Sequence, residues 1–163
     1  MNIRPNEHER HDYAATLVWT GARDGPTNSY QSYSREHEVQ CNTKPPVRLS
    51  ADPHFRGDAR LYNPEELLVV SLSSCHLLSY LAECARAGVH VLAYEDRASG
   101  VMTVRDGKLR FTEVVLRPRV TIAPGVDVDR ARALHGPAHD DCYIANSVNF
   151  PVRHEPTIVV ATD

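Results

Sequence analysis

The segment "NPEELLVVSLSSCH" at residues 63–76 decides the fold, because a helix start leads directly into a nearly unbroken apolar stretch. Asn63 is a favourable N-cap, Pro64 suits the first helical position, and acidic residues follow at the positive end of the helix dipole. The pattern predicts a helix over 64–87 that ends at Gly88, which tolerates a left-handed cap. Its apolar residues occupy more than one face: Leu67, Leu68, Val70, Leu72, Leu77, Leu78 and Leu81. We therefore expect this helix to be central and buried on several sides.

Strand patterns flank the helix on both sides. Alternating apolar and polar residues predict strands near residues 13–20, 32–41, 47–50, 89–104, 109–123 and 155–162. The Asp106-Gly107 pair predicts a hairpin turn, and residues 127–148 are typical of two short helices interrupted at Gly136-Pro137. Helices and strands do not alternate regularly along the chain. The order therefore indicates an α+β fold with largely antiparallel sheet.

Length and charge exclude several classes of protein. The 163 residues correspond to one domain, which we place at 11–163 after a flexible tail at 1–10. A formal net charge of -3 without a basic stripe predicts no nucleic-acid partner. The longest apolar run, Leu67–Leu72, falls far short of the roughly 20 residues that cross a bilayer, and the polar N-terminus does not resemble a signal peptide. These features predict a cytoplasmic protein with no membrane partner.

Cys75 lies at the centre of the helical segment and permits two interpretations. A free cysteine in an apolar helix is most often a buried, inert residue. Ser73, Ser74 and His76 nevertheless surround it with polar groups that a purely packed helix turn does not require. The local pattern alone favours the inert interpretation, and the polar neighbours point towards reactivity.

Helix geometry restricts the partner of Cys75. Cys84 follows nine residues later, so it faces the opposite side about 13 Å along the axis, whereas a disulfide needs Cα atoms within about 7 Å. Cys84 is therefore interpreted as a core residue, and a redox partner must be Cys41 or Cys142. Cys142 lies in the polar segment "HDDCYIAN", whereas Cys41 lies on the apolar face of a predicted strand and is expected to be buried.

A metal site is a weaker alternative. His135, His139 and Cys142 have ligand-like spacing, and the Cys75-His76 pair could complete a set. Zinc motifs usually contain tighter ligand pairs, and Pro137 interrupts the helix between the two histidines. We predict no metal and no other cofactor.

Three separate blocks resemble the OsmC/Ohr family of thiol-dependent peroxidases. "TGARDG" at 20–25 is similar to the segment with the family's active-site arginine, which falls on Arg23. "NPEELLVVSLSSC" resembles the central helix and places the glutamate on Glu65 and the peroxidatic cysteine on Cys75. "AHDDCYIAN" is similar to the segment with the resolving cysteine, Cys142. Family members commonly have proline after that cysteine, and Tyr143 stands here. Together with "SSCH" and "NSVNFPVRHEP", this departure points to the less characterised OsmC-like branch and not to an organic hydroperoxide resistance protein proper.

The resemblance implies both a fold and an activity. The fold would be antiparallel sheets packed around a long central helix in an intertwined dimer. The activity would be cofactor-free reduction of organic hydroperoxides, with hydrogen peroxide as a second substrate, in oxidative or osmotic stress defence. Arg23 would favour the Cys75 thiolate and Glu65 would hold Arg23, while Cys142 would close a disulfide. An external dithiol, from a lipoyl protein or a thioredoxin-type protein, would then reduce that disulfide.

One spacing favours a homodimer independently. Glu65 precedes Cys75 by ten residues, about 15 Å along a straight helix, so the two do not meet within one helix. A helix that is apolar on most sides also needs more cover than one small sheet provides. Both features fit sites that form at a dimer interface.

Simpler interpretations of the same residues stay open. Arg23 could be a solvated charge in a turn, and Glu65 could serve only the helix dipole. The whole chain could also be a non-catalytic OsmC-fold protein that binds a small molecule or is associated with stress. The joint occurrence of Arg23, Glu65, Cys75 and Cys142 favours the peroxidase.

Overall fold

The computed structural model describes residues 10–162, so all but the last residue of the predicted tail lies outside the described residues. The chain divides into two compact units, Met1–Glu65 and Glu66–Asp163, and each is described by itself. The single domain predicted for 11–163 stays a prediction.

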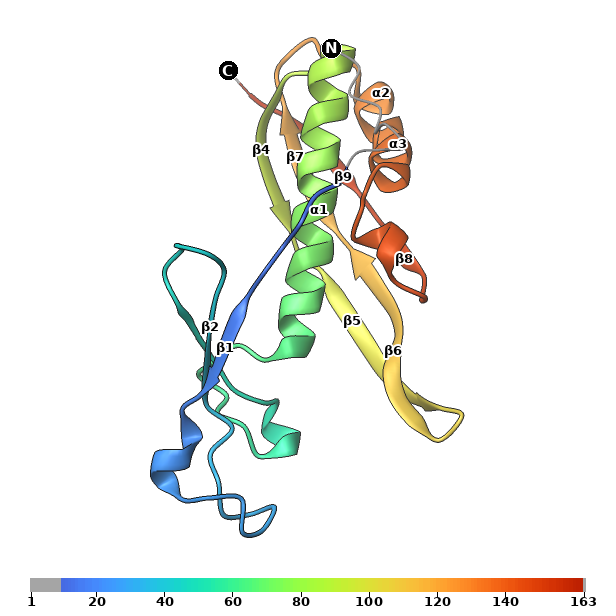
Figure 1. The fold of residues 1–163 in the computed structure, drawn as a ribbon. Helices are drawn as coiled ribbons and strands as arrows, with labels where there is room; N and C mark the ends of the chain where they lie inside the picture. Colours follow the sequence, from blue (N-terminus) through green and yellow to red (C-terminus); the bar gives the residue numbers. More distant parts are fainter. Residues whose placement is uncertain (1–9, 163) are drawn as a thin grey trace. The chain divides into compact units, whose positions relative to one another are not determined.

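The first unit contains one small antiparallel sheet (Figure 1). Its strands are β1 (Thr16–Trp19), β2 (His37–Gln40) and β3 (Val47–Leu49), in that order. Short 3-10 turns follow at Gly21–Asp24 and Pro53–Phe55. Gly21 is required by close packing, because an added Cβ would lie 2.1 Å from the carbonyl oxygen of Ser34. The three strands predicted here are confirmed, although each is shorter than predicted.

The prediction that Cys41 is buried is wrong. Strand β2 ends at Gln40, and Cys41 begins a turn in which its carbonyl accepts a hydrogen bond from the Lys44 N–H at 3.1 Å. The thiol is exposed. The alternation of faces that suggested burial does not extend past the last residue of a strand.

The central helix has the predicted bounds. Helix α1 spans Pro64–Ala87, and Gly88 follows with a left-handed φ of 67°. The helix is long and apolar enough to cross a membrane by length and composition alone. Within the second unit, however, it is a core helix, because four residues at four-residue spacing are buried in the protein: Leu72, His76, Tyr80 and Cys84. Cys84 is thus confirmed as a core residue.

Burial of α1 is confined to one side in the single chain. Val70, Leu78 and Leu81 remain 55%, 64% and 38% exposed. The predicted burial on several sides is therefore not found within one copy of the chain. An apolar stripe of the helix is left facing solvent.

Two mixed sheets make up the β-structure of the second unit. Strands β4 (Val91–Asp96), β7 (Pro118–Ile122) and β9 (Thr157–Val160) form one sheet, and β5 (Ser99–Arg105), β6 (Lys108–Leu116) and β8 (Val152–His154) form the other. The pairs β6–β8 and β7–β9 are parallel, and the other pairs are antiparallel. Asp106 and Gly107 form the predicted hairpin turn, with φ of 51° and 71°. The α+β prediction is confirmed, with more parallel pairing than expected.

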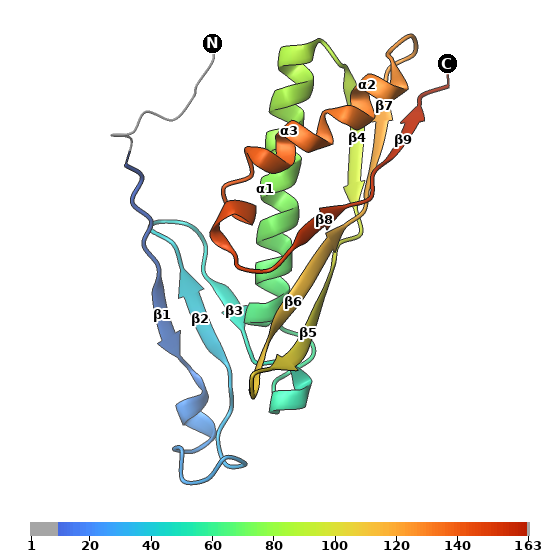
Figure 2. The ribbon, with the colours of Figure 1, turned by 90° about the vertical axis from the view of Figure 1, so that its right-hand side faces the viewer.

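Two short helices follow the predicted order but break at another point. Helix α2 spans Val128–Ala133 and α3 spans His135–Asp140, so the break lies at Leu134 and not at Gly136-Pro137. Pro137 is tolerated because the N–H groups of a first helical turn have no partner within the helix. Figure 2 shows α3 crossing α1, with β8 following in the chain after a 3-10 turn at Ala145–Ser147. This crossing brings the C-terminal end of α3 to the middle of α1.

The packing of α1 generates a stability prediction. Leu72 is fully buried with Val114 and Leu116 of β6, so Leu72→Ala should lower the free energy of unfolding by about 2–5 kcal/mol. Leu92→Ala, at a position 60% exposed on β4, is the matched control and should cost much less. Urea unfolding curves measure both values. Equal losses would contradict the assigned core.

Candidate functional site

Two cysteines from distant parts of the sequence meet in the second unit. Cys75 is half-buried on α1, and Cys142 is 1% exposed directly after α3. The Cys142 N–H donates to the carbonyl of His139 at 3.1 Å, which continues the end of α3 and directs the residue inward. The side chain of Cys75 lies close enough to that of Cys142 to raise the pKa of the Cys142 thiol. Neither thiol forms a disulfide in the structure.

Burial controls the protonation of Cys142. Desolvation raises the pKa of its thiol to about 11, and the contact with Cys75 acts in the same direction. Backbone hydrogen bonds from Ala145 and Ile144 oppose the shift, because N–H groups favour a thiolate. At neutral pH, Cys142 is therefore a protonated thiol in a nearly dry environment.

The polar residues around Cys75 have structural partners. The Ser73 hydroxyl donates to Asp96 on β4 at 2.5 Å. The ring of His76 is hydrogen-bonded to the ring of His135 at 2.9 Å. Ser74 is exposed. The polar neighbours that pointed towards a reactive Cys75 therefore also hold α1 against β4 and α3.

Four histidines from α1, α3 and β8 form a cluster: His76, His135, His139 and His154. The rings of His76 and His135 are stacked with centroids 5.2 Å apart, and His154 of β8 lies 5.5 Å from His76. His139 of α3 lies 5.7 Å from His154. His154 ends strand β8, and no local pattern in the sequence indicates that it belongs to this cluster.

The cluster is not arranged as a metal site. Within residues 10–162, no group of three or more histidine, cysteine or acidic side chains is placed to hold a metal ion. The rings of His76 and His135 instead bond directly to each other. The ligand-like spacing of His135, His139 and Cys142 in the sequence does not become a set of converging ligands.

The other two predicted site residues lie in the first unit, and they are not paired with each other. Arg23, in the 3-10 turn after β1, forms an ion pair with Glu36 at 3.2 Å, and Arg48 binds the same carboxylate at 2.7 Å. The Arg23 side chain is 65% exposed, as for a solvated turn residue. The expected Arg23–Glu65 pair is thus replaced by Arg23–Glu36 in this structure.

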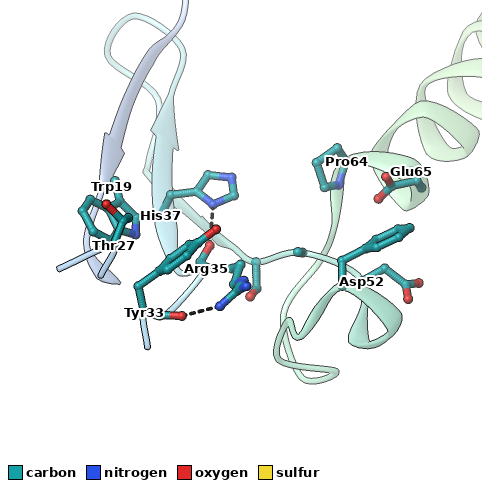
Figure 3. Close-up of a pocket in the computed structure, with 11 residues that line it drawn as sticks. Trp19, Thr27, Tyr33, Arg35, His37, Asp52, Pro64 and Glu65 are labelled. Atoms are coloured by element: carbon teal, nitrogen blue, oxygen red, sulfur yellow. Dashed lines mark hydrogen bonds between the residues drawn. The ribbon is translucent and has the colours of Figure 1, made fainter. Parts of the chain in front are cut away.

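Glu65 lines a pocket of about 350 Å³ within the first unit (Figure 3). Aromatic residues Trp19, Tyr33 and Phe55 contribute to its wall. The Glu65 Oε2 atom is buried and has no hydrogen-bond partner among the described residues. The pocket therefore combines apolar surface with charged and polar side chains, which include Arg35, Asp52 and Glu65. Local sequence did not indicate this pocket, because its residues come from six different segments.

Comparison with known proteins gives consistent matches over most of the chain. Residues 57–157 match the OsmC-like protein family. An OsmC-like protein of unknown function from Vibrio cholerae is 31% identical, with a TM-score of 0.83 over 91% of this chain and 100% of that chain. The uncharacterized protein YmaD of Bacillus subtilis is 25% identical over 108 residues, which cover 64% of this chain and 72% of YmaD.

The fold is also shared with a more distant protein. An organic hydroperoxide resistance protein from Elizabethkingia anophelis has a TM-score of 0.68 over 94% of this chain and 99% of that chain. Its sequence identity is 17%, so this similarity concerns the fold.

The burial of Cys142 predicts slow alkylation. At pH 8 and in the reduced protein, iodoacetamide should modify Cys142 at least about tenfold more slowly than the exposed Cys41, because only the thiolate reacts. Mass spectrometry of peptides after timed quenching measures both rates in the same sample. Equal rates would contradict the buried, protonated state of Cys142.

Proposed function

The chain belongs to the OsmC-like protein family, and we propose that it is a thiol-dependent peroxidase that reduces organic hydroperoxides. The family includes hydroperoxide-reducing thiol peroxidases. We place the activity in the cytoplasm, in defence against oxidative or osmotic stress, with hydrogen peroxide as a second substrate.

The observation that carries the proposal is that Cys75 lies close enough to Cys142 for the two thiols to influence each other. In a reducing compartment, two free thiols in contact form a redox couple more readily than a structural disulfide. Cys75 is the more accessible of the two, so it is assigned the attack on the peroxide. Cys142, buried and protonated, is assigned the second step.

The cycle balances with these two thiols and one external dithiol. Cys75 attacks the O–O bond, takes one oxygen as a sulfenic acid and releases an alcohol that keeps the other oxygen. The Cys142 sulfur then displaces water from the sulfenic acid and forms the disulfide, which prevents over-oxidation. A lipoyl or thioredoxin-type dithiol reduces the disulfide by thiol exchange and leaves as a disulfide itself.

Tyr143 does not stand in the way of this cycle. It replaces the proline that commonly follows the resolving cysteine, yet its side chain is 66% exposed and Cys142 still contacts Cys75. The Tyr143 carbonyl accepts a hydrogen bond from the Ser147 hydroxyl at 2.7 Å. This bond stabilises the turn after Cys142 without the rigid ring of a proline.

Arg23 and Glu65 would complete the site from a second copy of the chain. Glu65 and Cys75 lie ten residues apart on the continuous helix α1, about 15 Å, so one chain does not bring them together. The exposed apolar residues Val70, Leu78 and Leu81 of α1 provide a surface for that second copy. In such a homodimer, Glu65 would bind Arg23, and the guanidinium would polarise the peroxide beside Cys75 of the partner.

A second candidate function is supported by the pocket in the first unit. Its aromatic wall and the unpartnered Glu65 oxygen suit a small organic molecule with a hydrogen-bond donor. A non-catalytic OsmC-fold binding protein would use this pocket and would show no peroxide turnover. Turnover distinguishes the two functions.

Removal of each thiol tests the assigned roles. Cys75→Ser should abolish steady-state consumption of an organic hydroperoxide with a dithiol reductant, whereas Cys41→Ser should retain it. Cys142→Ser should still form the Cys75 sulfenic acid, which dimedone labels, but should over-oxidise at excess peroxide. Full turnover by Cys75→Ser would refute the proposed peroxidase.

Complementation between inactive variants tests the shared site. If each site combines Cys75 of one chain with Glu65 of the other, mixing Cys75→Ser and Glu65→Gln chains should restore one intact site per mixed dimer. Activity should then approach about a quarter of the wild-type value, because half of a statistical mixture is heterodimer with one of two sites intact. Partial unfolding and refolding would exchange the chains before the assay. An inactive mixture, with mixed dimers verified by native mass spectrometry, would contradict the shared site.

A further inference from the structure

The buried histidine cluster holds α3 against α1 through one direct bond. His76 is 1% exposed and His135 is 0% exposed, and the Nε2 of His76 lies 2.9 Å from the Nδ1 of His135. The His135 ring is also stacked on Tyr80 with centroids 3.9 Å apart. No other hydrogen bond between side chains of α1 and α3 is recorded among the described residues.

One ring nitrogen must donate and the other must accept, so the accepting ring must be neutral. Burial also disfavours a second proton on the donating ring, so the pair is most stable when each imidazole carries a single proton. The remaining ring nitrogens, Nδ1 of His76 and Nε2 of His135, are buried without a partner among residues 10–162. A proton added to either ring would create a buried charge with nothing to stabilise it.

The groups around the pair offer little compensation. His154 faces the pair from β8, and His139 faces His154 from α3. Tyr80 faces His135 from α1, donates its hydroxyl to the Ala131 carbonyl of α2 at 3.1 Å, and borders Cys84 and Tyr94. Asp140 acts on His154, where its charge opposes the effect of burial. Apart from Tyr80, the ionisable rings that face His76 and His135 are thus other histidines, and each of these repels further protons once it is protonated.

The same helix positions the resolving thiol. Cys142 follows the C-cap residue Asp141 of α3 and is tied to the helix by its bond to the His139 carbonyl. The Ser79 hydroxyl of α1 adds one weaker bond, to the Asp141 carbonyl at 3.3 Å. Separation of α3 from α1 would therefore move Cys142 away from Cys75.

We propose that the His76–His135 pair positions Cys142 against Cys75 and releases it when the histidine cluster takes up protons. This inference rests on the proposed redox role of the two thiols. His76 and His135 are positioning residues, since they act through the placement of α3. The consequence is a disulfide-forming step that is lost under mild acid, while the first oxidation at Cys75 is not governed by the pair.

The direction of the pH effect follows from linkage. Burial, followed by the neighbouring histidines, lowers the pKa of His76 to about 4 and that of His135 to about 3. In an open state both rings regain an ordinary pKa near 6.5, so the open state binds more protons below that pH. The closed arrangement is therefore fully stable above pH 6.5 and weakens as the pH falls from 6.5 towards 4. Each histidine increases the open population by up to about tenfold per pH unit in this window.

Hydrogen exchange of the reduced protein tests the opening without any peroxide chemistry. The amides of Ala138, Asp141 and Cys142 are bonded within α3 and its end, so they report on this helix. After correction for intrinsic exchange, their open population should rise by between about tenfold and a hundredfold per unit from pH 6.5 to 5. Strands β5 and β6, which contain no histidine, serve as the internal control. If the open population of α3 does not change between pH 7 and pH 5, the proposal is overturned.

Two variants separate titration from simple packing. His135→Asn keeps an amide that can bond to His76 but cannot titrate. In this variant, the slope of the logarithm of the open population of α3 against pH should fall by about one proton. His154→Asn removes a titrating ring at the edge of the cluster and keeps the pair, so it provides a second measurement if the first variant unfolds. His90→Asn, at an exposed position, should leave the slope unchanged. An unaltered slope in both cluster variants would overturn the proposal.

A second arm measures the thiols themselves. After one equivalent of hydroperoxide, the ratio of disulfide to trapped sulfenic acid should fall between pH 7 and 5 more steeply in the wild type than in His135→Asn. Absence of any oxidation at Cys75 would refute the peroxidase and leave the exchange result to decide the positioning role. Oxidation with identical pH profiles in the two proteins would overturn the positioning role alone.

Discussion

The structure depends on the burial of one stripe of α1. Leu72, His76, Tyr80 and Cys84 recur every fourth residue, so they share a face that no water reaches. Leu72 packs with β6, whereas Tyr80 and Cys84 join the core formed with β7 and the short helices. Because this stripe fixes α3 across α1, it also determines that Cys142 lies against Cys75. Fold and candidate chemistry therefore have the same physical origin.

Several parts of the fold were predictable because local chemistry decides them. Proline and acidic residues at the start and Gly88 at the end define α1, and Asp106-Gly107 defines a hairpin turn. The break between α2 and α3 was misplaced, because Gly136 and Pro137 are read as a helix breaker although a first helical turn accepts both. Cys41 was misplaced for a related reason, since the end of β2 has no marker in the sequence.

The site was predictable only in part, because its contacts are non-local. Helix geometry predicts that Cys84 does not pair with Cys75, and the structure places Cys84 in the core and Cys142 near Cys75. The polar residues Ser73 and His76 beside Cys75 also have structural partners that the sequence does not reveal, since they bind Asp96 and His135. The histidine cluster draws on α1, α3 and β8, so no window of sequence contains it. The Arg23–Glu36 pair likewise depends on the antiparallel pairing of β1 with β2. The spacing of the two residues along the sequence does not reveal that pairing.

The central claim is that Cys75 and Cys142 form one redox couple. The measurement that tests it most directly is mass spectrometry of the protein after one equivalent of an organic hydroperoxide, with the free thiols blocked before digestion. The account predicts a disulfide-linked pair of peptides that contain Cys75 and Cys142, with Cys41 and Cys84 recovered as blocked thiols. A linkage through Cys41, or all four cysteines recovered unlinked and unoxidised, would contradict it.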